Sequence, residues 1–180
     1  MIMLYTIGHG NRSIEELIAL LAGAGIECLV DVRAYPASRR HPQFARAALE
    51  RSLAASGIRY VWEGQALGGR RKPEAASPHI ALKEPGFRAY ADHMTTEVFR
   101  EGLTRLAGLG RATRAAVMCA EQLPSQCHRS FIADSLVARG ETVVHILSGG
   151  GEQPHVLSGL ARRDGDRLVY DAGQQLGLRL

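Results

Sequence analysis

The sequence contains no hydrophobic run long enough to cross a membrane and no secretory leader. A membrane-spanning helix needs about 20 consecutive apolar residues, and no segment of the chain reaches that length. The opening residues MIMLYTIGHG lack the basic region and the small-residue cleavage site of an export signal. We therefore expect a cytoplasmic protein that does not insert into membranes.

Cysteine is scarce, and its count is odd. The three cysteines are Cys28, Cys119 and Cys127. An odd number of cysteines without an export signal does not indicate a disulfide framework, so we expect free thiols. Thiol chemistry and metal binding both stay open for them.

Charge of either sign is moderate. Charged residues make up 22% of the 180-residue chain, and the formal net charge is +4. Such a small basic excess is compatible with anionic partners but does not by itself indicate them. Hydrophobic residues make up 46% of the sequence, which is too many for a disordered chain. A chain of this length can bury one core, so we expect residues 1–180 to form a single α/β domain.

Short apolar segments alternate with amphipathic ones along the chain. The apolar segments predict strands at residues 3–7, 28–32, 59–62, 115–118 and 142–146. Helical spacing appears at residues 14–23, 45–57, 87–94, 97–109 and 125–140. A strand, a helix and a second strand in succession imply a right-handed crossover and parallel pairing. The sequence therefore predicts a three-layer α/β fold, with a mostly parallel open sheet of about five strands and helices on both faces.

Local signals define some boundaries of these elements. Ser13 stands three residues before Glu16, which predicts a capping box at the first helix. Ser125 is a candidate cap for the helix that ends near Gly140. Residues 63–85 have no periodicity and predict a long loop, and residues 167–170 predict an edge strand.

Polar residues directly follow four of the predicted strands. In an open parallel sheet, ligands bind outside the carboxyl ends of the strands, where loops and helix N-termini converge. These residues are His9, Asn11 and Arg12 after the first strand, Asp31, Arg33, Tyr35, Arg39 and Arg40 after the second, Glu63 and the run Gly68 to Lys72 after the third, and Cys119, Glu121, Cys127, His128 and Arg129 after the fourth. Their placement at one edge favours a functional site over an ordinary solvated surface.

The segment VMCAEQLPSQCHRS carries the sharpest chemical signal. A cation in the first turn of a helix costs about 0.3–1 kcal/mol against the helix dipole unless an anion is nearby. Arg129 therefore indicates a bound ligand or a carboxylate partner such as Glu121 or Asp31. Because positive surroundings also favour a thiolate, we hypothesise that Cys119 is a nucleophile. His128 or His9 would carry the proton, and Glu121 is a further catalytic candidate.

The arginines of this edge are candidates for binding an anion. We expect Arg33 and Arg129 to hold a phosphorylated, nucleotide-like or otherwise anionic substrate. Further anion-binding candidates are Asn11, Arg39, Arg40, Arg70 and Arg71, and Asp31, Tyr35 and Cys127 complete the candidate site. The first hypothesis is therefore an enzyme that acts on an anionic small molecule. The residues indicate no particular cofactor or oligomeric state.

Three other interpretations of the same residues stay open. Free cysteines often serve only to pack a core. The arginines could bind nucleic-acid or nucleotide phosphates without catalysis, which predicts a steep dependence of binding on salt. A metal-dependent site could form at the MCAE and CHR segments, although the C-x7-C-H spacing differs from the C-x2-C spacing of structural zinc sites.

Five ordered motifs resemble those of a known family. The motifs are TIGHGNRS, LVDVRAYPASRRHPQF, LGGRR, FRAYADHM and MCAEQLPSQCHRSFIADSL. Nearly all of the chain up to His145 resembles the bacterial and archaeal family called domain of unknown function 488, a resemblance that implies no particular activity. LVDVR is also similar to the start of rhodanese-type domains. The order of strand, Cys, loop, Arg and helix is similar to the thiolate cradles of sulfur-transfer enzymes and phosphatases. In those cradles Cys and Arg lie around a short loop, whereas nine residues separate Cys119 from Arg129.

Overall fold

The computed structural model describes residues 1–172 and contains one six-stranded sheet. Its strands are β1 (Met3–Gly8), β2 (Cys28–Asp31), β3 (Arg59–Trp62), β4 (Ala115–Cys119), β5 (Thr142–Ile146) and β6 (Glu152–Pro154). They lie in the order β3-β2-β4-β1-β5-β6, and all neighbours pair in parallel except β5 and β6. The five expected strands and the parallel α/β architecture are confirmed. The sixth strand was missed because its residues, Glu-Gln-Pro, are all exposed and have no apolar pattern.

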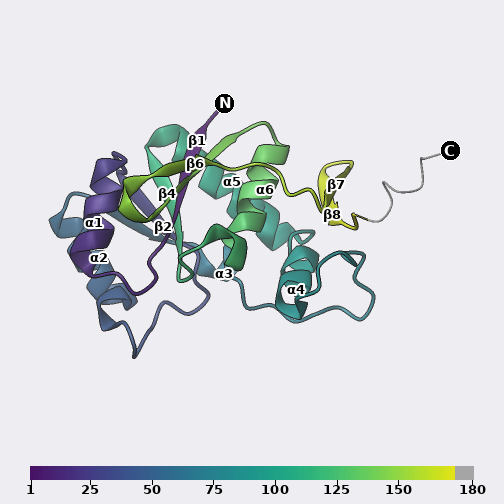
Figure 1. Cartoon of the computed structure of the whole chain (residues 1–180), viewed down its shortest axis with the longest axis horizontal. Coiled ribbons are helices and arrows are strands. Elements are labelled where there is room, and N and C mark those ends of the chain that lie inside the picture. Colours follow the sequence, from purple (N-terminus) through teal and green to yellow (C-terminus); the bar gives the residue numbers. More distant parts are fainter. Residues whose placement is uncertain (173–180) are drawn as a thin grey trace.

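Helices cover both faces of the sheet. One face carries α1 (Ile14–Gly23) and α2 (Arg46–Ala55), and the other carries α3 (Gly64–Leu67), α4 (Pro85–His93), α5 (Glu97–Ala112) and α6 (Arg129–Ala138). Figure 1 shows α1 and α2 on one side of the sheet and α5 and α6 on the other. Within residues 1–172, no helix combines the length and apolar character needed to cross a bilayer.

The helix boundaries follow local chemistry where a cap is present. Ser13 Oγ accepts a hydrogen bond from the Glu16 backbone N–H at 3.1 Å, and the Glu16 carboxylate accepts one from the Ser13 N–H at 2.7 Å. This is the predicted capping box, which satisfies two otherwise free donors at the start of α1. Shortly after α1, Gly25 adopts φ = +66°, a conformation that favours glycine.

Three local predictions differ from the structure. Helix α6 begins at Arg129 and not at Ser125, because residues 124–126 form a separate 3₁₀ turn and Cys127 is extended (φ −136°, ψ 143°). The predicted loop 63–85 includes the short helix α3. The strand at 167–170 is β8 (Arg167–Tyr170), which pairs with β7 (Ala161–Asp164) in a separate hairpin and does not extend the main sheet.

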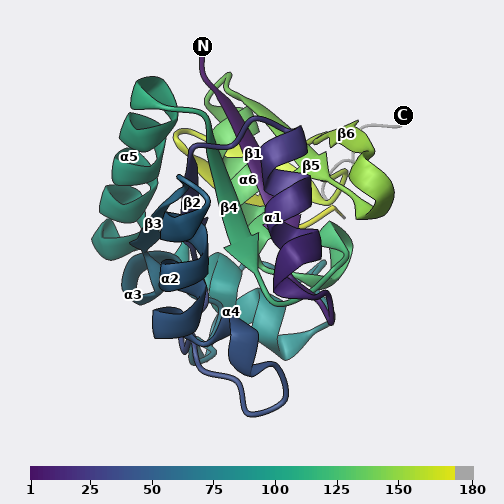
Figure 2. The same ribbon diagram turned by 90° about the vertical axis from the view of Figure 1, so that its left-hand side faces the viewer.

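The sheet topology brings the ends of β1, β2 and β4 together. Strand β4 lies between β2 and β1, so the loops after all three strands converge at one edge. In Figure 2 this is the lower edge, toward which the arrowhead of β4 points and beside which α4 lies. Gly8 allows the loop after β4 to approach β1 closely, since a Cβ atom at Gly8 would lie 1.8 Å from the Glu121 carbonyl oxygen.

Candidate active site

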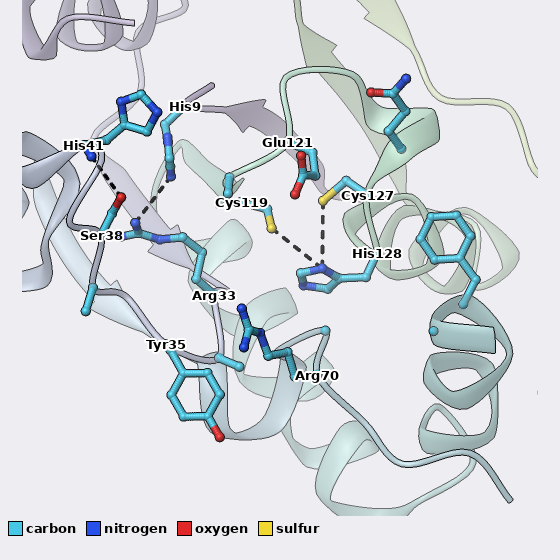
Figure 3. A pocket seen from close by; sticks show the side chains of 17 residues that line it. His9, Arg33, Tyr35, Ser38, His41, Arg70, Cys119, Glu121, Cys127 and His128 are labelled. Atoms are coloured by element: carbon cyan, nitrogen blue, oxygen red, sulfur yellow. Dashed lines mark hydrogen bonds between the residues drawn. The ribbon is translucent and has the colours of Figure 1, made fainter. Parts of the chain in front are cut away.

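A cavity of about 410 Å³ lies at the carboxyl edge of the sheet. Its walls come from the loops that follow β1, β2 and β4, from the segment after α3 and from the start of α4. Eight of the side chains singled out in the sequence line this cavity: His9, Arg33, Tyr35, Arg70, Cys119, Glu121, Cys127 and His128 (Figure 3). The edge predicted from strand order is therefore the place where these side chains meet.

Cys119, Cys127 and His128 form the most compact group in the cavity, and we call them the cysteine–histidine cluster. His128 Nδ1 lies 3.6 Å from Cys119 Sγ and 3.8 Å from Cys127 Sγ. Both cysteines are buried, at 6% and 1% exposure. Cys119 ends β4, while Cys127 and His128 immediately precede α6. Figure 3 shows both sulfur atoms pointing at the His128 ring.

The two thiols of the cluster differ in acidity. A hydrogen bond to Cys127 is the main cause that raises the pKa of Cys119, and burial raises it further. Burial also acts to raise the pKa of Cys127, but hydrogen bonds from Cys119 and His128 and the charge of Arg129 outweigh it and hold that pKa well below its usual range. Within this pair of cysteines, Cys119 is the hydrogen-bond donor and Cys127 the acceptor, and Cys127 is the more acidic thiol. The sequence hypothesis placed the thiolate on Cys119, whereas these directions favour Cys127.

The Arg129 guanidinium binds main-chain carbonyl oxygens and is not positioned to bind an anion directly. It is 1% exposed and donates hydrogen bonds to the main-chain carbonyl oxygens of Glu121 and Gln122, the second at 2.8 Å. It forms no ion pair with a carboxylate of residues 1–172, so the partner expected at Glu121 is the backbone and not the side chain. Its charge instead acts on the neighbouring cysteines.

Arg33 is anchored by the buried carboxylate of Asp31. Arg33 Nε and Nη2 donate to the two Asp31 oxygens at 2.9 and 2.6 Å, and Nη2 also donates to the Phe44 carbonyl at 2.8 Å. Tyr60 OH donates to Asp31 Oδ2 at 2.7 Å. These bonds fix the guanidinium plane and leave Nη1 with a single long contact, 3.4 Å from His9 Nε2. Asp31 therefore positions Arg33, which lines the cavity.

His9 is a neutral group at physiological pH. Burial lowers its pKa to about 4, and a hydrogen bond with the Gly10 carbonyl opposes that shift. Because a carbonyl oxygen only accepts, the 2.8 Å contact places the proton on His9 Nδ1 and leaves Nε2 free to accept from Arg33. The ring also stacks on Phe44, with centroids 4.3 Å apart.

The remaining basic candidates separate into two groups. Arg70 lines the cavity, lies over the exposed Tyr35 ring at 5.5 Å and forms no ion pair within residues 1–172. Arg71 donates to the carbonyl oxygens of Gly68 and Gln65 at 2.9 and 2.7 Å, so it braces its own loop. Asn11, Arg39 and Arg40 are exposed and do not line the cavity.

Sequence reasoning missed several residues of the cavity wall. His41 and Ser38 line it, and Ser38 Oγ accepts a hydrogen bond from the His41 N–H at 2.9 Å. Gly69, which belongs to the run Gly68 to Lys72 expected at this edge, also lines the cavity, and a Cβ atom there would lie 2.6 Å from His128 Nδ1. The His-Pro step at 41–42, which opens a 3₁₀ turn, was the available signal for His41. The paired glycines of LGGRR were the available signal for a close approach.

The fold and the site define an α/β protein with a cavity at the carboxyl edge of a mostly parallel sheet, lined in part by arginine, histidine and cysteine side chains. The model of the family described as Domain of unknown function DUF488 matches residues 13–136, and the chain belongs to that family. No curated protein and no solved structure matches the chain. The matched range contains all the residues of the cavity wall except His9.

Proposed function

We propose that this protein is an enzyme that binds a small anionic substrate in the carboxyl-edge cavity and acts on it at the cysteine–histidine cluster. One observation supports this best: Arg33 and Arg70 line the same cavity as the two sulfur atoms and the imidazole of the cysteine–histidine cluster. Cysteines and arginines that merely packed or faced solvent would not need to converge there. A cavity of about 410 Å³ suits a molecule no larger than a mononucleotide or a small phosphate ester.

The two arginines have different parts in this proposal. Asp31 holds Arg33 so that Nη1 points in a fixed direction, and Arg33 therefore loses little side-chain conformational entropy when it binds an anion. Arg70 carries a charge that no carboxylate of residues 1–172 pairs, and with Tyr35 it covers one side of the cavity. Glu121 also lines the cavity and would serve as a proton carrier. The unpaired thiols suit a reducing compartment such as the cytoplasm.

Anion binding is tested by calorimetric titration with inorganic phosphate and phenyl phosphate. We expect Arg70→Gln to weaken binding about 10-fold, since a charge-assisted hydrogen bond contributes about 1.5–3 kcal/mol. Arg40→Gln is the matched control, because Arg40 is exposed nearby but does not line the cavity. Equal losses in both variants, with a steep salt dependence, would favour the alternative of a diffuse nucleic-acid-binding surface.

Catalysis is tested separately with a panel of anionic phosphate esters and thioesters. Any turnover by the wild-type protein should be lost in Cys127→Ser and kept in Cys28→Ala. Cys28 is a buried cysteine of β2 that lies outside the cavity, and burial raises its pKa. Turnover that survives Cys127→Ser would remove the cluster from the mechanism.

A further inference from the structure

The cysteine–histidine cluster brings three metal-ligand atoms to one point. Cys119 Sγ, Cys127 Sγ and a ring nitrogen of His128 all lie within 4.8 Å of one another, and no other group of three such residues occurs in the part of the chain that the structure describes. Two sulfurs and one imidazole are soft and borderline donors, which favour Zn²⁺ over Mg²⁺ or Ca²⁺. The C-x7-C-H spacing forms this group through a loop that folds back from β4 to the start of α6.

The two sulfur-to-nitrogen distances within the cluster are close to those of a tetrahedral site. An ion bound at about 2.3 Å from each sulfur and about 2.0–2.1 Å from nitrogen separates sulfur from nitrogen by about 3.6 Å. The observed separations from His128 Nδ1 are 3.6 Å to Cys119 Sγ and 3.8 Å to Cys127 Sγ. With all three atoms within 4.8 Å of one another, a single ion could lie among them.

The surroundings of the cluster orient its ligands. His128 Nε2 lies 3.3 Å from the Val32 carbonyl oxygen and can donate to it. In the tautomer with its proton on Nε2, the Nδ1 lone pair faces the sulfurs, and binding of a metal ion would select this tautomer over the Nδ1–H form that donates to Cys127 in the metal-free cluster. A histidine that binds metal through one nitrogen commonly donates from the other to a carbonyl or carboxylate. The Arg129 backbone N–H donates to Cys127 Sγ at 3.4 Å.

We propose that Cys119, Cys127 and His128 bind one thiophilic divalent metal ion, Zn²⁺ in the first instance, with a fourth position that opens into the cavity. Structural zinc sites have four protein ligands, whereas catalytic sites have three and leave one place for water or substrate. Only three ligands converge within residues 1–172, and all three line the cavity that holds Arg33 and Arg70. This inference rests on the proposed function for its catalytic meaning, because it names the group that would polarise the anionic substrate.

Metal content and cobalt spectroscopy test the inference directly. The full chain, freed of any affinity tag, is purified without chelator and its zinc is measured by mass spectrometry. After stripping and reduction it is titrated with Co²⁺, which we expect to bind at one equivalent per chain with thiolate-to-metal charge-transfer bands and the intense visible bands of a tetrahedral site. Cys119→Ser, Cys127→Ser and His128→Ala should each weaken Co²⁺ binding by more than about 100-fold, beyond the effect of losing a surrounding partner alone.

The controls separate loss of a ligand from loss of fold. Cys28→Ala removes the third thiol without touching the cluster and should keep full stoichiometry and spectrum. Circular dichroism of each metal-free variant shows whether it has folded, and a variant that has not is replaced by Cys127→Ala or His128→Gln. No Co²⁺ or Zn²⁺ binding by the reduced wild-type protein would overturn the inference, as would binding that Cys127→Ser leaves unchanged.

Phosphate titration of the same protein preparations shows whether a negative result concerns the metal site or the proposed anion-binding function. If phosphate binding depends on Arg70 but no metal binds, the metal site falls and the anion-binding enzyme stands. If metal binds in one equivalent but phosphate does not bind at all, the metal site stands and the anionic substrate falls.

Discussion

Two histidine clusters lie at helix α6, one directly before its first residue and one that includes its Asp134, and they differ in how fully their polar atoms are partnered. Behind the helix, Thr6, His145, His155, Asp134 and Tyr170 form a chain that we call the histidine–aspartate network. Its contacts run from Thr6 Oγ1 to His145 Nδ1 at 2.7 Å, from His145 Nε2 to His155 Nδ1 at 2.9 Å and from His155 Nε2 to Asp134 Oδ1 at 2.9 Å. Tyr170 OH donates to Asp134 Oδ2 at 2.9 Å. Every side-chain polar atom of this chain has a partner.

The cysteine–histidine cluster at the start of α6 is partnered differently. Its sulfur and nitrogen atoms face one another at 3.6 and 3.8 Å and also line an open cavity. The polar atoms of the histidine–aspartate network are all hydrogen-bonded within the protein and stabilise the fold. The polar atoms of the cysteine–histidine cluster face a cavity, where they are available to a ligand. An unusual residue type alone therefore does not mark a functional site. His145 and His128 are both unusual, but only His128 lines the cavity.

The largest expected effect is on stability, from removal of the acceptor in the histidine–aspartate network. Asp134→Ala would leave His155 Nε2, Tyr170 OH and the Ser158 N–H without their acceptor. Because Asp134 is 2% exposed, water cannot replace it without opening the core. We expect a loss of about 3–5 kcal/mol in the free energy of unfolding, measured by urea denaturation.

The control for this variant is an aspartate of the β7–β8 hairpin, the hairpin that carries Tyr170. Asp166 is exposed, and Asp166→Ala should change the free energy of unfolding by less than about 0.5 kcal/mol. A loss below about 1 kcal/mol in Asp134→Ala would mean that the network contributes little to the fold, and the contrast between the two clusters would then disappear.

The next effect concerns acid sensitivity. Burial is the main cause that lowers the pKa of His145 to about 4, and the charges of His155 and Arg129 lower it further. In the unfolded chain His145 has its ordinary pKa of 6.5, so as the pH falls it takes up a proton there before it does so in the folded protein. Stability should therefore be fully present above pH 6.5 and decrease as the pH falls toward 4, by up to about 3 kcal/mol from this residue.

Urea unfolding of the wild type and of His145→Gln at pH 7 and pH 4.5 isolates that contribution. The lowered pKa values of His9, His79 and His93 also reduce the free energy of unfolding over this pH range. This contribution is the same in both proteins, so it cancels in the difference between them. We expect the wild type to lose more stability than the variant. Equal losses would show that the His145 imidazole does not stay neutral in the folded protein.

Much of the fold was predictable because its strands are continuous apolar runs. Strands buried on both faces, such as β4 with the sequence AAVMC, differ clearly from their surroundings. The capping box of Ser13 and Glu16 fixed the start of α1. Strand β6 was not predictable because it depends on its pairing with β5, not on an apolar pattern of its own. The true start of α6 was not predictable because it depends on the conformation of the loop before it.

The position of the candidate site was also predictable, whereas its geometry was not. Strand order alone places Cys119, Arg33 and His9 at one edge. The sequence does not show that Arg71 and Arg129 turn to main-chain carbonyls, because those acceptors exist only once the loops have folded. Nor does it show which cysteine has the lowered pKa, since that depends on the hydrogen bonds among Cys119, Cys127 and His128 in the folded protein.

The smallest expected effect tests whether the orientation of His128 matters when all three ligands are kept. Gly69→Ala would place a methyl group 2.6 Å from His128 Nδ1, so the ring must shift. We expect this to weaken Co²⁺ binding about 10-fold, comparable to the loss of a partner that orients a metal ligand. Gly86→Ala is the matched control, because Gly86 also lines the cavity but a Cβ atom there meets nothing within 4 Å. Unchanged affinity in Gly69→Ala would mean that the ring can move while still binding the ion, and that the cluster is less rigid than the histidine–aspartate network behind it.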